Sequence, residues 1–248
     1  MDPVIAAHRG LDEFAPENTA PAFIAALELG MAVEVDRRRT SDGEIVIIHD
    51  DTLDRTTSGS GPVAEATLAE IKTLDAGRWH GELFAGERVP TLQDLLDVAA
   101  RHGRAATTLV LETKVDDPQM GADVCRALNE HGLMPHAIGI GTIMTSQDVR
   151  RRFREADAGF NAACLADAPE DLESALADEF SNWVCSRFVP TRQQMEIAHQ
   201  AGKRLIASGP DAMNDVELAL EAMRNGVDIA LSNHPVDIVA LWRDRVGD

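Results

Sequence analysis

Imidazole, carboxylate and guanidinium groups occur at short spacing near the start of this chain. They form three groups, each at or just after the end of a short apolar run: His8-Arg9, Glu34-x-Asp36 and His49-Asp50. Two imidazoles can supply a general acid and a general base. Two carboxylates that lie one residue apart on a β-strand point the same way and can share a hard cation. This combination indicates metal-assisted transfer at an anionic centre.

A later run repeats the spacing of two residues. Glu112 and Lys114 end the segment Thr108-Thr-Leu-Val-Leu-Glu-Thr-Lys. Glu112 can add a third carboxylate to Glu34 and Asp36, and an all-oxygen site of this kind suits Ca²⁺ or Mg²⁺ better than zinc, which favours nitrogen and sulfur ligands. Lys114 can then neutralise a phosphate oxygen, or it can serve only as a salt-bridge partner.

Nine short β-branched or apolar runs must position these groups, and amphipathic stretches separate most of them. The runs cover residues 4–7, 32–35, 45–48, 108–111, 137–140, 162–165, 183–185, 204–207 and 227–231. Strands that alternate with helices over about 250 residues predict an α/β fold, a closed (β/α)8 TIM barrel. In such a barrel Glu34 and Asp36 face the interior, while Val33 and Val35 face the helices.

The barrel has eight places for nine candidate strands. The seven residues between Asp36 and Glu44 are too few for a crossover helix, and they contain the turn signal Ser41-Asp42-Gly43. The run that ends at His49 therefore either returns antiparallel or is reached by a helix-free crossover. Both paths bring His49 to the mouth of the barrel, where Glu34 and Asp36 lie.

Capping residues predict where helices begin and end. Asn18 is expected to cap a helix that stops at Gly30, and Thr91 with Asp94 to open a helix that ends at Gly103.

Residues 51–90 interrupt the alternation of strands and helices. They are rich in Thr, Ser and Gly and contain one short helical pattern, at 68–74. Insertions in such barrels lie over the active face, so we expect a small cap beside the site. No linker divides the rest of the chain, and the sequence predicts a single domain over residues 1–248.

Composition excludes several classes of partner. The formal net charge of −19 would repel nucleic acid and anionic lipid surfaces. The basic cluster Arg37-Arg38-Arg39 is expected to be solvated charge near a turn, with contact to an anion as the alternative. No run approaches the length of apolar residues that spans a bilayer. We therefore expect that any phosphate bound here is part of a small molecule, with no nucleic acid partner and no stable membrane association.

Location is indicated by the cysteines and the N-terminal residues. Cys125, Cys164 and Cys185 are odd in number and scattered, as expected of reduced core thiols. The first strand begins at Val4, with no leader pattern before it. Both features predict a cytoplasmic protein.

The motifs together resemble those of the glycerophosphodiester phosphodiesterase family. The resemblance is dense over the first 115 residues and rests on His8-Arg9-Gly10, Ala15-Pro-Glu-Asn-Thr19, Glu34-Val-Asp36, Thr40-x-Asp42-Gly43, His49-Asp50-x-x-Leu53-x-Arg55-Thr56-Thr57, Asp75-Ala-Gly77-x-Trp79, Val89-Pro-Thr-Leu92 and Glu112-x-Lys114. It continues thinly to the end through Ala201-Gly202-Lys203 and Gly226-Val-Asp228.

The resemblance implies a TIM-barrel hydrolase that splits glycerophosphodiesters into sn-glycerol 3-phosphate and an alcohol. It also implies roles for particular residues: one divalent cation, Ca²⁺ or Mg²⁺, held by Glu34, Asp36 and Glu112, an acid/base pair formed by His8 and His49, and phosphate contacts from Arg9 and Lys114.

Departures from the family pattern lie in the second half of the chain. They are Gly141-Thr142-Ile143 for Ser-Ser-Phe, Ala207-Ser-Gly-Pro210 for an aromatic residue with Thr-Val-Asn, and Ser232-Asn233 for Thr-Asp. Loss of bulk at 141, 207 and 209 predicts a rim without donors or aromatic faces. Such a rim would discriminate weakly among choline, ethanolamine and glycerol head groups.

The sequence leaves several alternatives open. The same barrel could act on another diester, such as a lysophospholipid or a glycerophosphoinositol, or it could be a catalytically silent phosphate-binding barrel. A metal-independent phosphatase, or a lyase that uses only the histidines, would retain activity in excess EDTA. The attacking group is either water or the neighbouring glycerol hydroxyl, which would give a cyclic phosphate first. The oligomeric state is also open.

Overall fold

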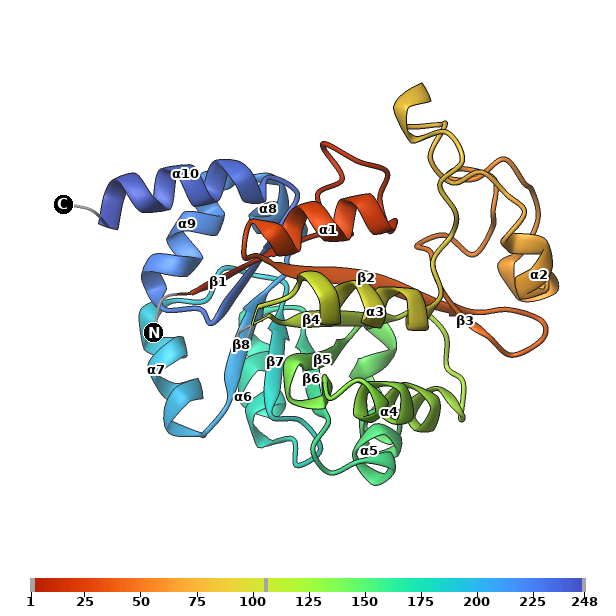
Figure 1. Ribbon diagram of the computed structural model, residues 1–248. Helices are drawn as coiled ribbons and strands as arrows, with labels where there is room; N and C mark the ends of the chain where they lie inside the picture. Colours follow the sequence, from red (N-terminus) through yellow and green to blue (C-terminus); the bar gives the residue numbers. More distant parts are fainter. Residues whose placement is uncertain (1–2, 105–106, 247–248) are drawn as a thin grey trace.

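The computed structural model describes residues 3–104 and 107–246, and its centre is a parallel β-barrel (Figure 1). Its strands are β1 (Val4–Ala7), β2 (Ala32–Arg39), β4 (Leu109–Thr113), β5 (Ala137–Ile140), β6 (Asn161–Ala166), β7 (Trp183–Ser186), β8 (Arg204–Ala207) and β9 (Ile229–Ser232). Each strand pairs in parallel with the next, and β9 pairs with β1, so the sheet closes. The predicted TIM barrel is confirmed.

The ninth candidate strand lies outside the barrel. β3 (Ile45–Ile47) pairs antiparallel with the last residues of β2, so that Arg37 lies opposite Ile47. Gly43 in the connecting turn has a φ of 90°, a conformation that favours glycine. Of the two paths that the sequence leaves open, the hairpin is the one adopted. It brings the chain back past Asp36, whose carbonyl accepts a hydrogen bond from the amide of Ile48 at 3.0 Å.

Helices cover the outer face of the barrel. They are α1 (Ala20–Glu28), α3 (Leu92–His102), α4 (Met120–Glu130), α5 (Gln147–Ala156), α6 (Leu172–Ala177), α7 (Arg192–Gln200), α9 (Val216–Asn225) and α10 (Pro235–Val246). The short helix α8 (Pro210–Asn214) lies instead in the loop after β8, at the mouth of the barrel. Short 3₁₀ helices η3 (Met134–His136), η4 (Thr142–Thr145) and η5 (Pro169–Asp171) lie in the loops. Within the described residues, no helix has the length and apolar character that crossing a membrane requires.

One predicted helix boundary is confirmed and another is wrong. Thr91 caps α3 by accepting a hydrogen bond from the amide of Asp94, and Gly103 follows the last residue of the helix. The N-cap of α1 is Thr19 rather than Asn18. Asn18 has a left-handed φ of 55°, and its side chain is bonded to Asp36 instead.

The alternation of side chains along β2 separates a polar interior from an apolar exterior. Val33 and Val35 are buried in the core between sheet and helices, as expected. Arg37 lies on the same face and is fully buried, so the prediction of solvated charge is wrong at this position. Its guanidinium donates to the carbonyl of Leu111 at 2.9 Å and lies 5.9 Å from the ring centre of Phe153. Burial lowers the pKa of Arg37 to about 9.

Residues 51–90 form a small structure at one side of the barrel, drawn in orange and yellow in Figure 1. It contains η1 (Val63–Glu65), α2 (Leu68–Ile71) and η2 (Glu82–Phe84), so the predicted helical pattern at 68–74 ends earlier than expected. Its apolar side chains pack with those of the β3 segment in a separate cluster formed by Val46, Ile48, Leu53, Val63, Ile71, Ala76 and Val89.

Candidate active site at the carboxyl ends of the strands

Three carboxylates meet inside the barrel because β2 and β4 pair in a particular register. Asp36 lies directly across from Glu112, and Glu34 lies one inward position below Asp36. One oxygen from each of Glu34, Asp36 and Glu112 lies within 4.8 Å of the others. Glu34 and Asp36 have no exposed surface. The structure thus brings together the three residues predicted to bind a cation.

The electrostatics of this cluster favour a bound cation. Glu34 Oε1 is buried without a hydrogen-bond partner. Burial, and then the charges of Asp36 and Glu112, raise the pKa of Glu34 well above its usual value. A group of buried carboxylates is stable when a cation balances it. The unpartnered oxygen and the all-oxygen donor set therefore fit a hard divalent ion.

Lys114 already supplies one positive charge to the cluster. Its Nζ lies 3.0 Å from Asp36 Oδ1 and 2.9 Å from Glu112 Oε1. Burial lowers the pKa of Lys114, but the two carboxylates outweigh it and raise the pKa above its usual value. For Asp36 the effects have the opposite sign. Burial raises its pKa, but the charges of Lys114 and His49 and the hydrogen bond from Asn18 bring the pKa below its usual value.

The loop after β1 fixes the two carboxylates of β2. The amide of Arg9 donates to Glu34 Oε2 at 3.0 Å, and Nδ2 of Asn18 donates to Asp36 Oδ2 at 2.8 Å. Both Arg9 and Asn18 have a φ of 55°, which is unfavourable for residues with side chains. The guanidinium of Arg9 binds Glu17 Oε1 at 3.0 Å and lies 3.4 Å from Asp36 Oδ2. The role of Asn18 was missed, although its motif, Ala15-Pro-Glu-Asn-Thr19, carried the signal.

His8 is held in one orientation by Asn233. Nδ1 of His8 lies 2.6 Å from Oδ1 of Asn233, so the Nδ1 proton is donated and Nε2 keeps its lone pair. Nε2 lies 3.9 Å from Glu34 Oε2. Burial and the charge of Arg9 lower the pKa of His8 to about 4. At neutral pH His8 is therefore an uncharged imidazole that can accept a proton.

His49 is held by a carboxylate rather than by an amide. Nδ1 of His49 lies 2.7 Å from Oδ1 of Asp50, and Arg55 donates to both oxygens of Asp50 at 2.7 and 3.0 Å. The same guanidinium binds both oxygens of Glu17 at 2.7 and 2.8 Å. Bonds from Arg55 keep the pKa of Asp50 well below its usual value. Arg55 thus joins the insertion to His49 and, through Glu17, to Arg9.

A pocket of about 280 Å³ opens above the carboxylates. Its walls combine predicted site residues with residues of the second half of the chain: His8, His49, Glu112, Lys114, Ile140, Gly141, Thr142, Leu165, Cys185, Arg187, Ser208, Pro210, Met213 and Leu231. The structure thus gathers every predicted site residue at this end of the barrel, although Arg9 contacts Glu17 and Asp36 rather than lining the pocket.

The predicted rim without donors is wrong. Thr142, Arg187 and Ser208 all line the pocket and can donate hydrogen bonds. Sequence reasoning missed Arg187, because this residue follows β7 and belongs to no recognisable motif. The reading of Ala207 is also wrong, since it is buried against the helices outside the barrel.

The two glycines of the rim allow close packing rather than adding space. A Cβ at Gly141, where φ is 131°, would lie 2.7 Å from the carbonyl oxygen of Thr113 and 3.2 Å from Cγ of Glu112. A Cβ at Gly209 would lie 2.1 Å from the carbonyl oxygen of Arg187. The loops after β5 and β8 therefore press directly on the backbone that carries site residues.

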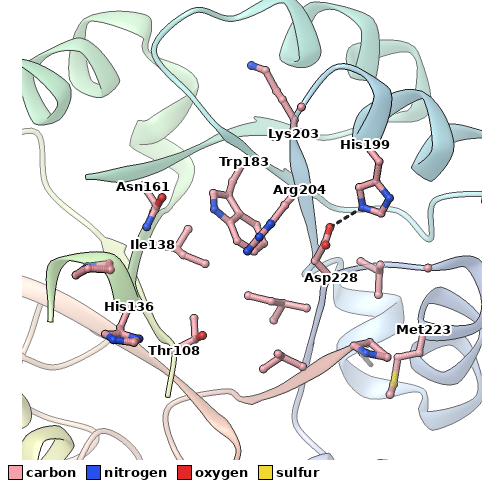
Figure 2. A pocket seen from close by; sticks show the side chains of 17 residues that line it. Thr108, His136, Ile138, Asn161, Trp183, His199, Lys203, Arg204, Met223 and Asp228 are labelled. Carbon is pink, nitrogen blue, oxygen red and sulfur yellow. Dashed lines mark hydrogen bonds and ion pairs between the residues drawn. The ribbon is translucent and has the colours of Figure 1, made fainter. Parts of the chain in front are cut away.

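A larger cavity, of about 590 Å³, lies at the opposite end of the barrel (Figure 2). Four of its lining residues already contact one another in pairs: His199 binds Asp228 at 3.0 Å, and the Arg204 guanidinium lies 5.6 Å from the centre of the Trp183 ring. Among the described residues, the buried polar side-chain atoms without partners include none that line this cavity. Because active sites of TIM barrels lie at the carboxyl ends of the strands, this cavity is not the reaction site.

Comparison with known proteins agrees with the geometry. The model of the glycerophosphoryl diester phosphodiesterase family matches residues 8–227. A glycerophosphodiester phosphodiesterase from Caldanaerobacter subterraneus subsp. tengcongensis is 32% identical over 246 residues, which cover 98% of this chain and 99% of that protein.

Two solved structures share the fold over almost the whole chain. The crystal structure of a glycerophosphodiester phosphodiesterase from Agrobacterium tumefaciens aligns with a TM-score of 0.79 at 29% identity, covering 96% of this chain and 99% of that one. A phosphodiesterase from Oleispira antarctica, in complex with its product sn-glycerol-3-phosphate, aligns with a TM-score of 0.81 at 27% identity, covering 96% of each chain. The resemblance inferred from the motifs is confirmed: this chain belongs to the glycerophosphoryl diester phosphodiesterase family and is a phosphoric diester hydrolase.

Proposed function

We propose that this enzyme hydrolyses glycerophosphodiesters to sn-glycerol 3-phosphate and an alcohol, with one divalent cation, Ca²⁺ or Mg²⁺, held by Glu34, Asp36 and Glu112. The observation that carries the proposal is the meeting of three carboxylates within 4.8 Å, below a pocket that both His8 and His49 line. The product bound by the Oleispira antarctica relative supports the choice of substrate class. The bound cation would neutralise charge on the phosphoryl oxygens.

His8 is suited to act as the general base. Its Nδ1–H donates a hydrogen bond to Asn233, and its Nε2 carries no proton at neutral pH. It would take the proton from the oxygen that attacks phosphorus.

His49 is suited to act as the general acid. The carboxylate of Asp50 lies 2.7 Å from its Nδ1 and would stabilise the imidazolium. The protonated ring would give its Nε2 proton to the departing alkoxide as the bond from phosphorus to oxygen breaks. After this step His8 carries one proton more and His49 one proton fewer. Transfer of a proton from His8 to His49 through solvent would restore both.

Lys114 would bind the substrate phosphate directly, while Arg9 would act on it from beside Asp36. The ammonium of Lys114 lies at the wall of the pocket, between two carboxylates that the cation would also bind. With these carboxylates neutralised by a cation, the ammonium would be free to contact a phosphate oxygen. Arg9 holds the loop that carries His8 and adds positive charge beside Asp36.

The proposal is tested by assaying a panel of phosphodiesters with Ca²⁺, with Mg²⁺ and with excess EDTA. We expect release of sn-glycerol 3-phosphate that requires the metal. Activity that survives EDTA would instead support a reaction that uses only the histidines. A complete absence of turnover, with phosphate still bound, would support the silent barrel. Against that reading, every position to which the resemblance assigns catalysis is filled.

We also propose that the enzyme works in the cytoplasm on small substrates. The three cysteines are buried and unpaired, which fits a reducing compartment. The net charge of −19 opposes binding to nucleic acid and to anionic membranes.

A further inference from the structure

Arg187 stands across the barrel from the carboxylates. It follows the last residue of β7, and the strand order β1-β2-β4-β5-β6-β7-β8-β9 places β7 opposite β2. Apart from Lys114, it is the one lysine or arginine among the residues that line the pocket. The wall around it is otherwise uncharged and is formed by Thr142, Leu165, Cys185, Ser208, Pro210, Met213 and Leu231.

The backbone of Arg187 is fixed in place. Its amide donates to the carbonyl of Ala166 at 3.0 Å, and Gly209 packs on its carbonyl so closely that no Cβ would fit. The amide of Ser208 in turn donates to the carbonyl of Ser186 at 2.9 Å. The sheet therefore fixes the place at the pocket from which the Arg187 side chain extends.

The side chain of Arg187 is held only weakly. Its Nη2 donates to Oγ1 of Thr142 at 3.1 Å, and its Nη1 lies 3.3 Å from Oδ1 of Asp167. The side chains of Arg187 and Asp167 are 42% and 58% exposed, respectively. Ion pairs that are this exposed contribute little to stability, so a ligand can replace Asp167 as the partner of Arg187.

We propose that Arg187, assisted by Thr142, forms a subsite for an anionic group on the alcohol arm of the substrate. This inference rests on the proposed function, because the phosphate at the carboxylate cluster directs one arm of the diester toward β7. Glycerol is neutral and is common to all substrates of the class. The alcohol is the arm that varies and can carry a carboxylate or a second phosphate. The enzyme therefore selects glycerophosphodiesters with an acidic head group, despite its own strongly negative charge.

Two pairs of substrates isolate the effect of the negative group. Glycerophosphoserine differs from glycerophosphoethanolamine by a carboxylate, and glycerophosphoinositol 4-phosphate differs from glycerophosphoinositol by a phosphate. We expect kcat/KM, at saturating metal, to be about 10-fold higher for the acidic member of at least one pair, since a single exposed charge-assisted bond is involved. The pair that shows the preference identifies whether the anion is a carboxylate or a phosphate.

Variants of Arg187 and its partner must shift this ratio in opposite directions. In Arg187→Gln the preference should fall below about 3-fold, while Asp167→Asn, which removes the competing carboxylate, should increase it. Arg78→Gln makes the same change of charge at an exposed arginine of the insertion and should leave the ratio unchanged. Equal rates on both members of both pairs, or a preference that survives Arg187→Gln, would overturn the inference while the hydrolase activity stands. No hydrolysis of any of the four diesters would overturn the proposed function itself.

Discussion

The two halves of the barrel mouth are built differently. In the half formed by β1, β2, β3 and β4, charged side chains are buried or partly buried, and each has several partners. Asp36, for example, contacts Asn18, Arg9 and Lys114. In the half formed by β5 to β8, Arg187 is exposed and has one exposed acidic partner. The first half can hold reacting groups in place, whereas the second can exchange its contacts. The difference fits the two proposals made above, in which catalytic groups lie on one wall of the pocket and a selective group lies on the opposite wall.

The largest effect should follow removal of a histidine from the first half. His8→Ala or His49→Ala should lower kcat about 10²–10⁴-fold, because each removes a positioned proton carrier. His102→Ala is a matched control, since His102 binds Glu28 far from the pocket. Steady-state kinetics at saturating metal, with metal binding measured in parallel, would check this. A variant with bound metal and near-full kcat would refute the pairing.

Removal of one carboxylate charge should weaken binding of the metal ion. Glu112→Gln keeps the shape of the side chain, and we expect the affinity for Ca²⁺ or Mg²⁺ to fall about 100-fold or more, since even residues that only support ligands change affinity about 10–100-fold. Calorimetric titration gives the affinity, and thermal unfolding shows that the fold persists. Glu130→Gln, at an exposed position on α4, is the control. Unchanged affinity in Glu112→Gln would remove this residue from the cation site.

A smaller effect is expected where the two halves meet, at Asn233. A base must be deprotonated, so activity should rise with pH through the pKa of His8, which burial lowers to about 4. In Asn233→Asp a carboxylate replaces the amide oxygen next to Nδ1 and favours the imidazolium. The acidic limb of the kcat/KM profile should therefore move to higher pH. An unmoved limb would mean that another group carries this proton.

The smallest effect should come from the apolar wall of the second half. Met213→Leu conserves volume at the pocket, and we expect kcat on glycerophosphoethanolamine to change by less than about 3-fold, with metal affinity unaltered. A loss as large as that of the histidine variants would show that this wall also holds reacting groups, and the contrast between the halves would fail.

Sequence reasoning succeeded where chemistry was carried by local motifs. The spacing of Glu34 and Asp36 on an apolar strand was enough to predict their common face, and the barrel then determined that they meet Glu112. The alternation that correctly placed Val33 and Val35 also puts Arg37 on the helix side, so its burial could have been predicted from the same parity. That residues 1–248 form one domain stays a prediction.

Sequence reasoning failed where distant segments compete for one group or meet without a motif. Asn18 is a favourable N-cap residue by local rules, but its side chain donates a hydrogen bond to Asp36 instead. Gly141 and Gly209 suggested open space, because a sequence does not show the backbone that presses against them. Arg187 reaches the pocket through the closure of the barrel, which local patterns do not specify.

The pairing of Asp36 with Glu112 has a consequence for how the chain folds. A slip of one residue between β2 and β4 would turn the acidic face of β2 toward the helices and bring Val33 and Val35 inside. The three carboxylates meet in the correct alignment alone, so an ion bound at the proposed site would stabilise that alignment and no other. The proposed cation site would therefore favour the correct register of the two strands during folding. Without an ion, the ammonium of Lys114 between Asp36 and Glu112 would still balance part of the negative charge that the barrel encloses.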